Sequence, residues 1–208
     1  MTGPAAVEAL VRDRLLPLDA YDPVEQRIRT EFARPPMDWQ PPGGPLQPAA
    51  VLVPIVEREP ELTVILTLRA AGLRRHSGQI AFPGGRAEPG EAPWEAALRE
   101  AEEEIGLDRR FVRVAGLGDP YDTVTGFSIT PVVGFVRPGF DIHAQEAEVA
   151  EIFEAPFDFL MNPANYERHS RDFGDGVSRQ YFAIPHEERL IWGATAGILR
   201  MLYERLYE

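Results

Sequence analysis

Glutamates are concentrated near the end of a stretch with helical periodicity, where Glu100, Glu103 and Glu104 recur three and four residues apart. At 100° per residue, their side chains share an arc of about 100°. Like charges at this spacing destabilise a helix, and the negative end of the helix dipole repels them further. Carboxylate oxygens are the preferred ligands of Mg²⁺ and Mn²⁺. The pattern therefore predicts a divalent-metal site, and a solvated acidic face is the alternative.

The helix that must position these carboxylates has recognisable ends and a separate apolar stripe. Pro93 suits its first position, and Gly106 is the expected glycine stop. The apolar residues fall between about 60° and 160° from Glu100, so the helix can pack against a sheet while the carboxylates stay clear of that contact. These apolar residues are Trp94, Ala97, Leu98, Ala101 and Ile105.

The spacing around this helix resembles the Nudix box. Gly85 is followed after five residues by Glu91 and, after seven more, by the run from Arg99 to Leu107, so every fixed position is present. Ala101 departs mildly from the motif, because the family usually has a larger aliphatic residue there. The resemblance implies an α+β fold, a Nudix-type αβα sandwich with a mixed β-sheet, and hydrolysis of a nucleoside diphosphate linked to another group.

The same resemblance implies roles for individual residues. Metal ions would clamp the diphosphate oxygens, neutralise charge in the transition state and lower the pKa of a bound water. Arg99 and Glu91 would orient the catalytic groups rather than take part in the chemistry. The implied ligands of Mg²⁺ or Mn²⁺ are the Gly85 carbonyl and the side chains of Glu100, Glu103 and Glu104.

In this family a glutamate outside the helix often supplies the general base or an extra metal ligand. The run from Glu146 to Glu151 follows the long loop that begins at Pro138 and enters a strand, which is the matching place. We expect Glu148 to deprotonate the attacking water, a contribution of typically about 10²–10⁴-fold. Glu146, Glu151 and a purely solvent-facing acidic turn are the alternatives.

A second pattern leads into the same glycines. The run from Ile65 to Ala70 is followed at three-residue gaps by Arg74, Gly78 and the turn from Phe82 to Gly85. This spacing resembles the signature of the coenzyme A pyrophosphatase branch of Nudix enzymes. The resemblance includes the opening of the final helix and covers roughly residues 49–207.

The second pattern implies hydrolysis of coenzyme A, or its acyl or oxidised forms, to 3′,5′-ADP and 4′-phosphopantetheine or its derivative. The alternatives are another nucleoside diphosphate derivative (ADP-ribose, NADH or a nucleoside triphosphate) and a non-catalytic binding module. Cationic donors ahead of the catalytic loop suit the substrate phosphates, with structural ion pairs as the other interpretation. These candidates are Arg69, Arg74, Arg75 and His76; Tyr121, Phe127 and Tyr181 are candidates for stacking on adenine or for the core.

Composition excludes several other classes of function. The formal net charge of −12 argues against a nucleic-acid partner, and the absence of cysteine rules out disulfides, thiolate catalysis and cysteine-bound zinc. No stretch approaches the roughly 18 apolar residues of a membrane helix, and the first residues do not read as a signal peptide. We therefore expect a cytoplasmic enzyme with a small-molecule substrate; whether it forms a homodimer stays open.

The 208 residues suit one domain with an extension. We expect an N-terminal helical extension with a Pro/Gly-rich connector over residues 1–48 and the Nudix hydrolase domain over 49–208. Helices are expected at 5–16, 22–34, 93–105, 157–161 and about 190–207, on both faces of a mixed sheet. Expected strands are 49–57, 62–68, 79–82, 111–118, 129–137, 148–153, 166–171 and 178–184.

Overall fold

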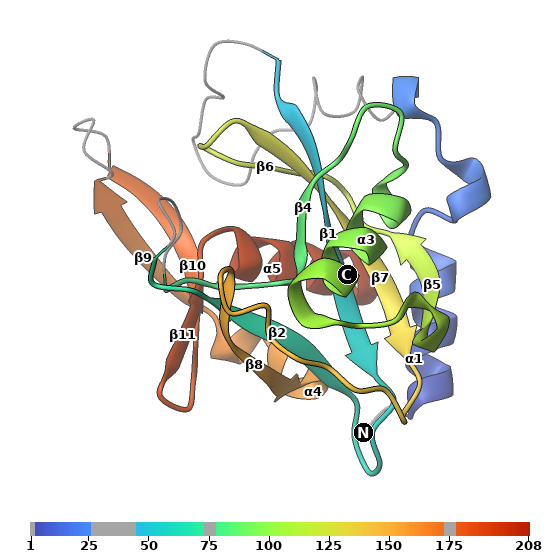
Figure 1. Cartoon of the computed structure of the whole chain (residues 1–208). Coiled ribbons are helices and arrows are strands. Elements are labelled where there is room, and N and C mark those ends of the chain that lie inside the picture. The colour runs from blue at the N-terminus through green and yellow to red at the C-terminus, as the bar shows by residue number, and fades with distance from the viewer. Residues whose placement is uncertain (1–2, 26–44, 73–77, 173–177) are drawn as a thin grey trace.

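A mixed β-sheet forms the middle layer of the computed structural model, which describes residues 3–25, 45–72, 78–172 and 178–208 (Figure 1). The larger sheet follows the order β3-β2-β1-β7-β5, with β4, β6 and β8 attached, and a smaller sheet follows the order β11-β10-β9. The strands are β1 Gln47–Val56, β2 Thr63–Arg69, β3 Ile80–Ala81, β4 Gly84–Arg86, β5 Val112–Leu117, β6 Tyr121–Asp122, β7 Phe127–Val136, β8 Val149–Pro156, β9 Glu167–Asp172, β10 Ser178–His186 and β11 Arg189–Trp192.

Helices cover both faces of the larger sheet, with α3 over one face and α5 over the other (Figure 1). The α-helices are α1 Pro4–Arg14, α3 Pro93–Ile105, α4 Phe157–Leu160 and α5 Ala194–Tyr207, and the 3₁₀ turns are η1 Leu18–Ala20, η2 Arg109–Phe111 and η3 Pro163–Asn165. The predicted layered fold, helices on both faces of a mixed sheet, is therefore confirmed.

Strand β1 lies at the centre and separates two cores. It runs parallel to β7 and antiparallel to β2 and β4. Because successive side chains of a strand point to opposite faces, Leu52 packs with the α3 core and Val53 with the α5 core. The α3 core includes Ala97, Ala101 and Ile105 of the predicted apolar stripe.

The first and last helices, α1 and α5, both pack into the α5 core. Val7 and Val11 of α1 are fully buried in the α5 core. The apolar residues Ile198, Leu199, Leu202 and Leu206 of α5 are buried there as well. Within the described residues, no helix is both long enough and apolar enough to cross a membrane.

One predicted boundary is wrong. The final helix begins at Ala194, not near Leu190, because residues Arg189–Trp192 form β11. Ile191 pairs with Ile184 of β10 and is fully buried, and Gly193 at φ +66° separates this strand from α5. The short strands β4 and β6 were not predicted, and most of the helix expected at 22–34 lies outside the described residues.

Candidate active site

Glu104 connects α3 to the ends of two strands. Its side chain is only 4% exposed, which is unusual for a carboxylate. The Gly84 N–H donates to Glu104 Oε2 at 3.1 Å, and Arg69 Nη1 donates to Glu104 Oε1 at 3.4 Å. Burial raises the pKa of Glu104 to about 7, although these two donors act in the opposite direction. A carboxyl group whose pKa lies near neutral pH is therefore held between β2, β4 and α3.

Arg99 forms hydrogen bonds with three carboxylates, those of Glu91 before the helix and of Glu100 and Glu103 on it. Its guanidinium donates to both oxygens of Glu91, at 2.9 and 3.0 Å, and to Glu100 Oε1 at 2.8 Å. It also donates to Glu103 Oε2 at 3.3 Å and to the Arg86 carbonyl at 3.2 Å. The bidentate contact lowers the pKa of Glu91. This geometry supports the orienting role that the sequence implies for Arg99 and Glu91.

Two glycines lie close to the glutamate helix, Gly85 in β4 beside Glu100 and Gly106 at the C-terminal end of α3. A Cβ atom on Gly85 would lie 2.5 Å from Cδ of Glu100, so no larger residue fits there without displacing that carboxylate. Gly106 ends α3 in the left-handed conformation, with φ +68°, and its N–H donates to the Glu102 carbonyl. The backbone thus approaches the carboxylates closely at Gly85, and the helix ends directly after Glu104.

Glu148 stands immediately before β8 and is exposed. Its carbonyl accepts a hydrogen bond from the Ala70 N–H at 2.8 Å, which ties it to the end of β2. Its charge contributes to the raised pKa of both Glu100 and Glu104, so it lies within electrostatic reach of α3. Glu151, in contrast, pairs with Arg189 of β11 at 2.5 Å. The charge of Glu148 thus acts on the carboxylates of α3, whereas Glu151 is paired with an arginine of the smaller sheet.

The predicted phosphate-binding residues fall into two groups. Arg69 lies at the end of β2, where one guanidinium nitrogen contacts Glu104. Its Nε atom is buried and has no hydrogen-bond partner among the described residues. Arg74, Arg75 and His76 lie outside the described residues. Arg69 is therefore paired with Glu104 of the glutamate helix, which is the kind of contact that the ion-pair interpretation describes.

The candidate stacking residues occupy different environments. Tyr121 lies against Gly197 of α5, and burial raises the pKa of its phenol. Tyr181 contacts two other rings on the smaller sheet, and Phe127 is half-buried at the start of β7. Tyr121 is therefore a partly buried residue packed against the α5 core, whereas Tyr181 lies among the rings of the smaller sheet.

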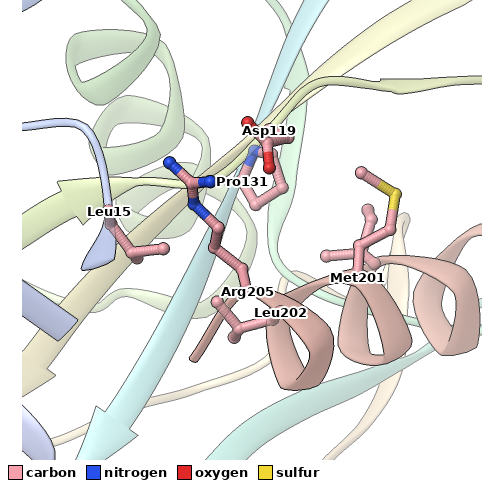
Figure 2. Close-up of a pocket in the computed structure, with 8 residues that line it drawn as sticks. Leu15, Asp119, Pro131, Met201, Leu202 and Arg205 are labelled. Atoms are coloured by element: carbon pink, nitrogen blue, oxygen red, sulfur yellow. The ribbon is translucent and has the colours of Figure 1, made fainter. Parts of the chain in front are cut away.

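A small pocket lies elsewhere, between α5, the residue that follows α1 and the segment between β5 and β6 (Figure 2). Leu15, Asp119, Pro131, Met201 and Arg205 are among its lining residues. None of the predicted catalytic or binding residues lines it, so it does not belong to the candidate active site.

The acidic face fits a divalent cation by its chemistry. Within the described ranges, no three acidic or histidine side chains are already gathered closely enough to hold a metal ion. Arg99 holds Glu100 and Glu103, whereas Arg69 and Gly84 hold Glu104. Burial, together with the neighbouring acidic charges, raises the pKa of Glu100 and Glu104. A cation would relieve this repulsion. The atoms that would bind it are carboxylate and carbonyl oxygens, the ligands that Mg²⁺ and Mn²⁺ prefer.

Comparison with known proteins identifies the family. Residues 45–173 match the model of the NUDIX domain, which is more than half of the chain. The chain belongs to the Nudix family. As a Nudix hydrolase, it acts on a nucleoside diphosphate derivative, and such enzymes generally use divalent ions such as Mg²⁺ or Mn²⁺.

Bacterial Nudix relatives extend the match over most of the chain. "Uncharacterized Nudix hydrolase NudL" of Citrobacter koseri is 45% identical over 157 residues, which is 74% of this chain and 80% of the relative. The protein of the same name from Cronobacter sakazakii is 40% identical over 191 residues, 90% of this chain and 93% of the relative. Among solved structures, a binary complex of Caenorhabditis elegans Ap4A hydrolase has a TM-score of 0.47 at 20% identity, over 53% of this chain and 80% of that one.

Proposed function

We propose that this Nudix hydrolase cleaves the diphosphate of coenzyme A, including its acyl and oxidised forms. The products are 3′,5′-ADP and 4′-phosphopantetheine or its derivative. The observation that carries the proposal is the contact of Glu104 with both Arg69 and Gly84. These two residues belong to the pattern that resembles the coenzyme A branch, whereas Glu104 belongs to the Nudix box. The contact thus supports a single site built from both motifs.

The proposed metal ligands are the residues that the Nudix box implies. A bound Mg²⁺ or Mn²⁺ would neutralise charge on the diphosphate and lower the pKa of a water. Because Arg99 contacts Glu91, Glu100 and Glu103 together, it keeps the carboxylates oriented for their role. The Gly85 carbonyl and the side chains of Glu100, Glu103 and Glu104 form the proposed ligand set.

The proposed chemistry is attack of water on one phosphorus atom. A new P–O bond forms, the bond to the bridging oxygen breaks, and that oxygen leaves with the other phosphate. Glu148 takes the proton of the attacking water, and its exposure beside α3 leaves it accessible to solvent. We further propose that Arg74, Arg75 and His76 bind substrate phosphates and that Arg69 supports Glu104 from the same segment. In this proposal, residues 1–48 form an extension of the domain built from residues 49–208. The enzyme is proposed to be cytoplasmic.

A substrate panel tests this proposal. Coenzyme A, acetyl-coenzyme A, dephospho-coenzyme A, ADP-ribose, NADH and ATP are compared at equal concentration with Mg²⁺ and with Mn²⁺, and the products are identified by mass spectrometry. We expect the highest kcat/KM for the forms that carry the 3′-phosphate, with 3′,5′-ADP as the common product. Equal or faster turnover of the compounds that lack this phosphate would overturn the coenzyme A assignment and favour another nucleoside diphosphate derivative.

A further inference from the structure

The smaller sheet has two chemically different faces. Phe182, Ile184 and Ile191 point to the α5 side, where the last two are fully buried. Side chains alternate along a strand, so the neighbours of these residues occupy the opposite face. That face carries His169, Tyr181 and Trp192, which we call the aromatic face.

The three rings of the aromatic face lie next to one another. The centroids of His169 and Tyr181 are 5.7 Å apart, and those of Tyr181 and Trp192 are 5.5 Å apart. The side chain of His169 is 38% exposed, and Tyr181 and Trp192 are half-buried. Leu190, on the same face of β11, is 42% exposed. The ring planes are tilted by 40° between His169 and Tyr181 and by 58° between Tyr181 and Trp192, and each ring belongs to a residue that is partly accessible to solvent.

Charge is distributed unequally along this face. Arg171 pairs with Arg179 in the register between β9 and β10, two positions from the pair formed by His169 and Tyr181. At the other end, the Glu167 carboxylate lies 2.7 Å from Nε2 of His169. The aromatic face is therefore flanked by cationic side chains on one side and an acidic one on the other, in a chain whose formal net charge is −12.

The smaller sheet is attached to the segment that enters the candidate active site. Strand β11 contacts β3, and Thr195 Oγ1, at the start of α5, donates to the Ile80 carbonyl at 2.9 Å. Ile80 lies four residues before Gly84, the residue that contacts Glu104. In Figure 1 the smaller sheet, β9 to β11, projects to one side of the molecule. The smaller sheet is therefore joined to the same segment that carries Gly84 to Glu104.

We propose that the aromatic face binds the adenine base of the substrate by stacking, while Arg171 and Arg179 contact a phosphate of the same nucleotide. Stacking on aromatic side chains suits any base, because every base has a flat π surface. Arginine forms bidentate contacts with phosphate groups. The inference rests on the proposed function, since the nucleotide end of coenzyme A combines adenine with a 3′-phosphate.

Calorimetric titration of 3′,5′-ADP into metal-free protein tests the inference without relying on catalysis. Tyr181→Leu removes the aromatic ring at similar volume, and we expect Kd to rise about tenfold or more. Tyr181→Phe keeps the ring and should bind within twofold of the unchanged protein. Tyr207→Leu is the matched control, because Tyr207 is an exposed aromatic on α5, 43% accessible and outside the aromatic face. Circular dichroism verifies that each variant is folded.

The outcomes separate this inference from the proposed function. If coenzyme A is cleaved but Tyr181→Leu binds 3′,5′-ADP as tightly as Tyr181→Phe does, the aromatic face does not bind the base and the inference alone fails. If Tyr181→Leu weakens 4′-phosphopantetheine instead, the face takes the other end of the substrate and the inference is again overturned. A tenfold rise in KM for coenzyme A with little change in kcat would support it. Failure of the proposed function is read independently, from the products of the substrate panel.

Discussion

Two groups of residues on the same acidic face differ sharply in environment. The inner group is Glu104 with Gly84 and Arg69, and its carboxylate is almost completely buried. The outer group is Arg99 with Glu91 and Glu103, and the side chain of Glu103 is 61% exposed. Burial raises the pKa of Glu104, whereas the Arg99 guanidinium lowers the pKa of Glu91.

The difference teaches that adjacent glutamates of one motif perform different physical tasks. The inner group places a carboxylate where its charge is costly unless a cation approaches, which suits a direct role in chemistry. In the outer group one arginine satisfies Glu91 and also contacts Glu103, which suits a positioning role for Arg99 and Glu91. Three measurements test this contrast.

The largest effect is expected for Glu104→Gln on turnover. Because the amide cannot supply the anionic oxygen that the proposed metal site requires, kcat should fall about 10³-fold while the variant remains folded. Steady-state kinetics with the best compound of the substrate panel measures this. Glu102→Gln is the control, since Glu102 is 51% exposed and pairs with Arg109 away from the acidic face. A loss below tenfold, about 1.4 kcal/mol in the barrier, would contradict a direct role.

The second prediction concerns the stability of the metal-free protein against pH. Because folding raises the pKa of Glu104 from 4.5 to about 7, the folded state binds more protons than the unfolded state in this window. The stability of the unchanged protein should therefore fall as pH rises through the window, and Glu104→Gln should remove that slope. At pH 8 we expect the variant to be more stable by about 3 kcal/mol.

Urea unfolding at pH 5 and pH 8, with a chelator present, measures this difference. At pH 5 the two proteins should be close in stability, because the carboxyl is largely protonated in the folded state. Glu103→Gln, at an exposed position of the outer group, provides the comparison and should show little change. A Glu104→Gln variant that is less stable at pH 8 would show that its neighbours compensate the buried charge.

The smallest effect is expected at the outer group and has the opposite sign. Arg99 lowers the folded-state pKa of Glu91, so its contribution to stability is present above pH 4.5 and is lost as pH falls through the lowered pKa. Glu91→Gln should therefore destabilise the protein at pH 7 by less than about 1 kcal/mol, since this ion pair is only partly buried. Urea unfolding at pH 7 and pH 3 measures it; an equal loss at both would indicate lost packing instead of lost charge.

Local signals explain which parts of the fold could be predicted. Helix α3 begins at Pro93 and ends before Gly106, as predicted. Proline favours the first turn of a helix and glycine favours its end, and both effects depend only on the few neighbouring residues of the chain. Strand β11 was mistaken for the start of α5, because a short apolar run has no periodicity of its own. Its pairing with β10 decides its conformation, and that pairing depends on residues outside the run.

The sequence by itself determined the kind of chemistry, because the spacing of three glutamates along a helix is a local property of the chain. It also determined that Gly85 and Arg99 belong to the same motif. That Glu104 is buried while Glu103 is exposed, that Arg69 contacts Glu104, and that the charge of Glu148, just before β8, acts on Glu104 all depend on the tertiary structure. Burial and contacts of this kind arise when segments far apart in the chain pack together, and no local pattern encodes which side chain will be enclosed.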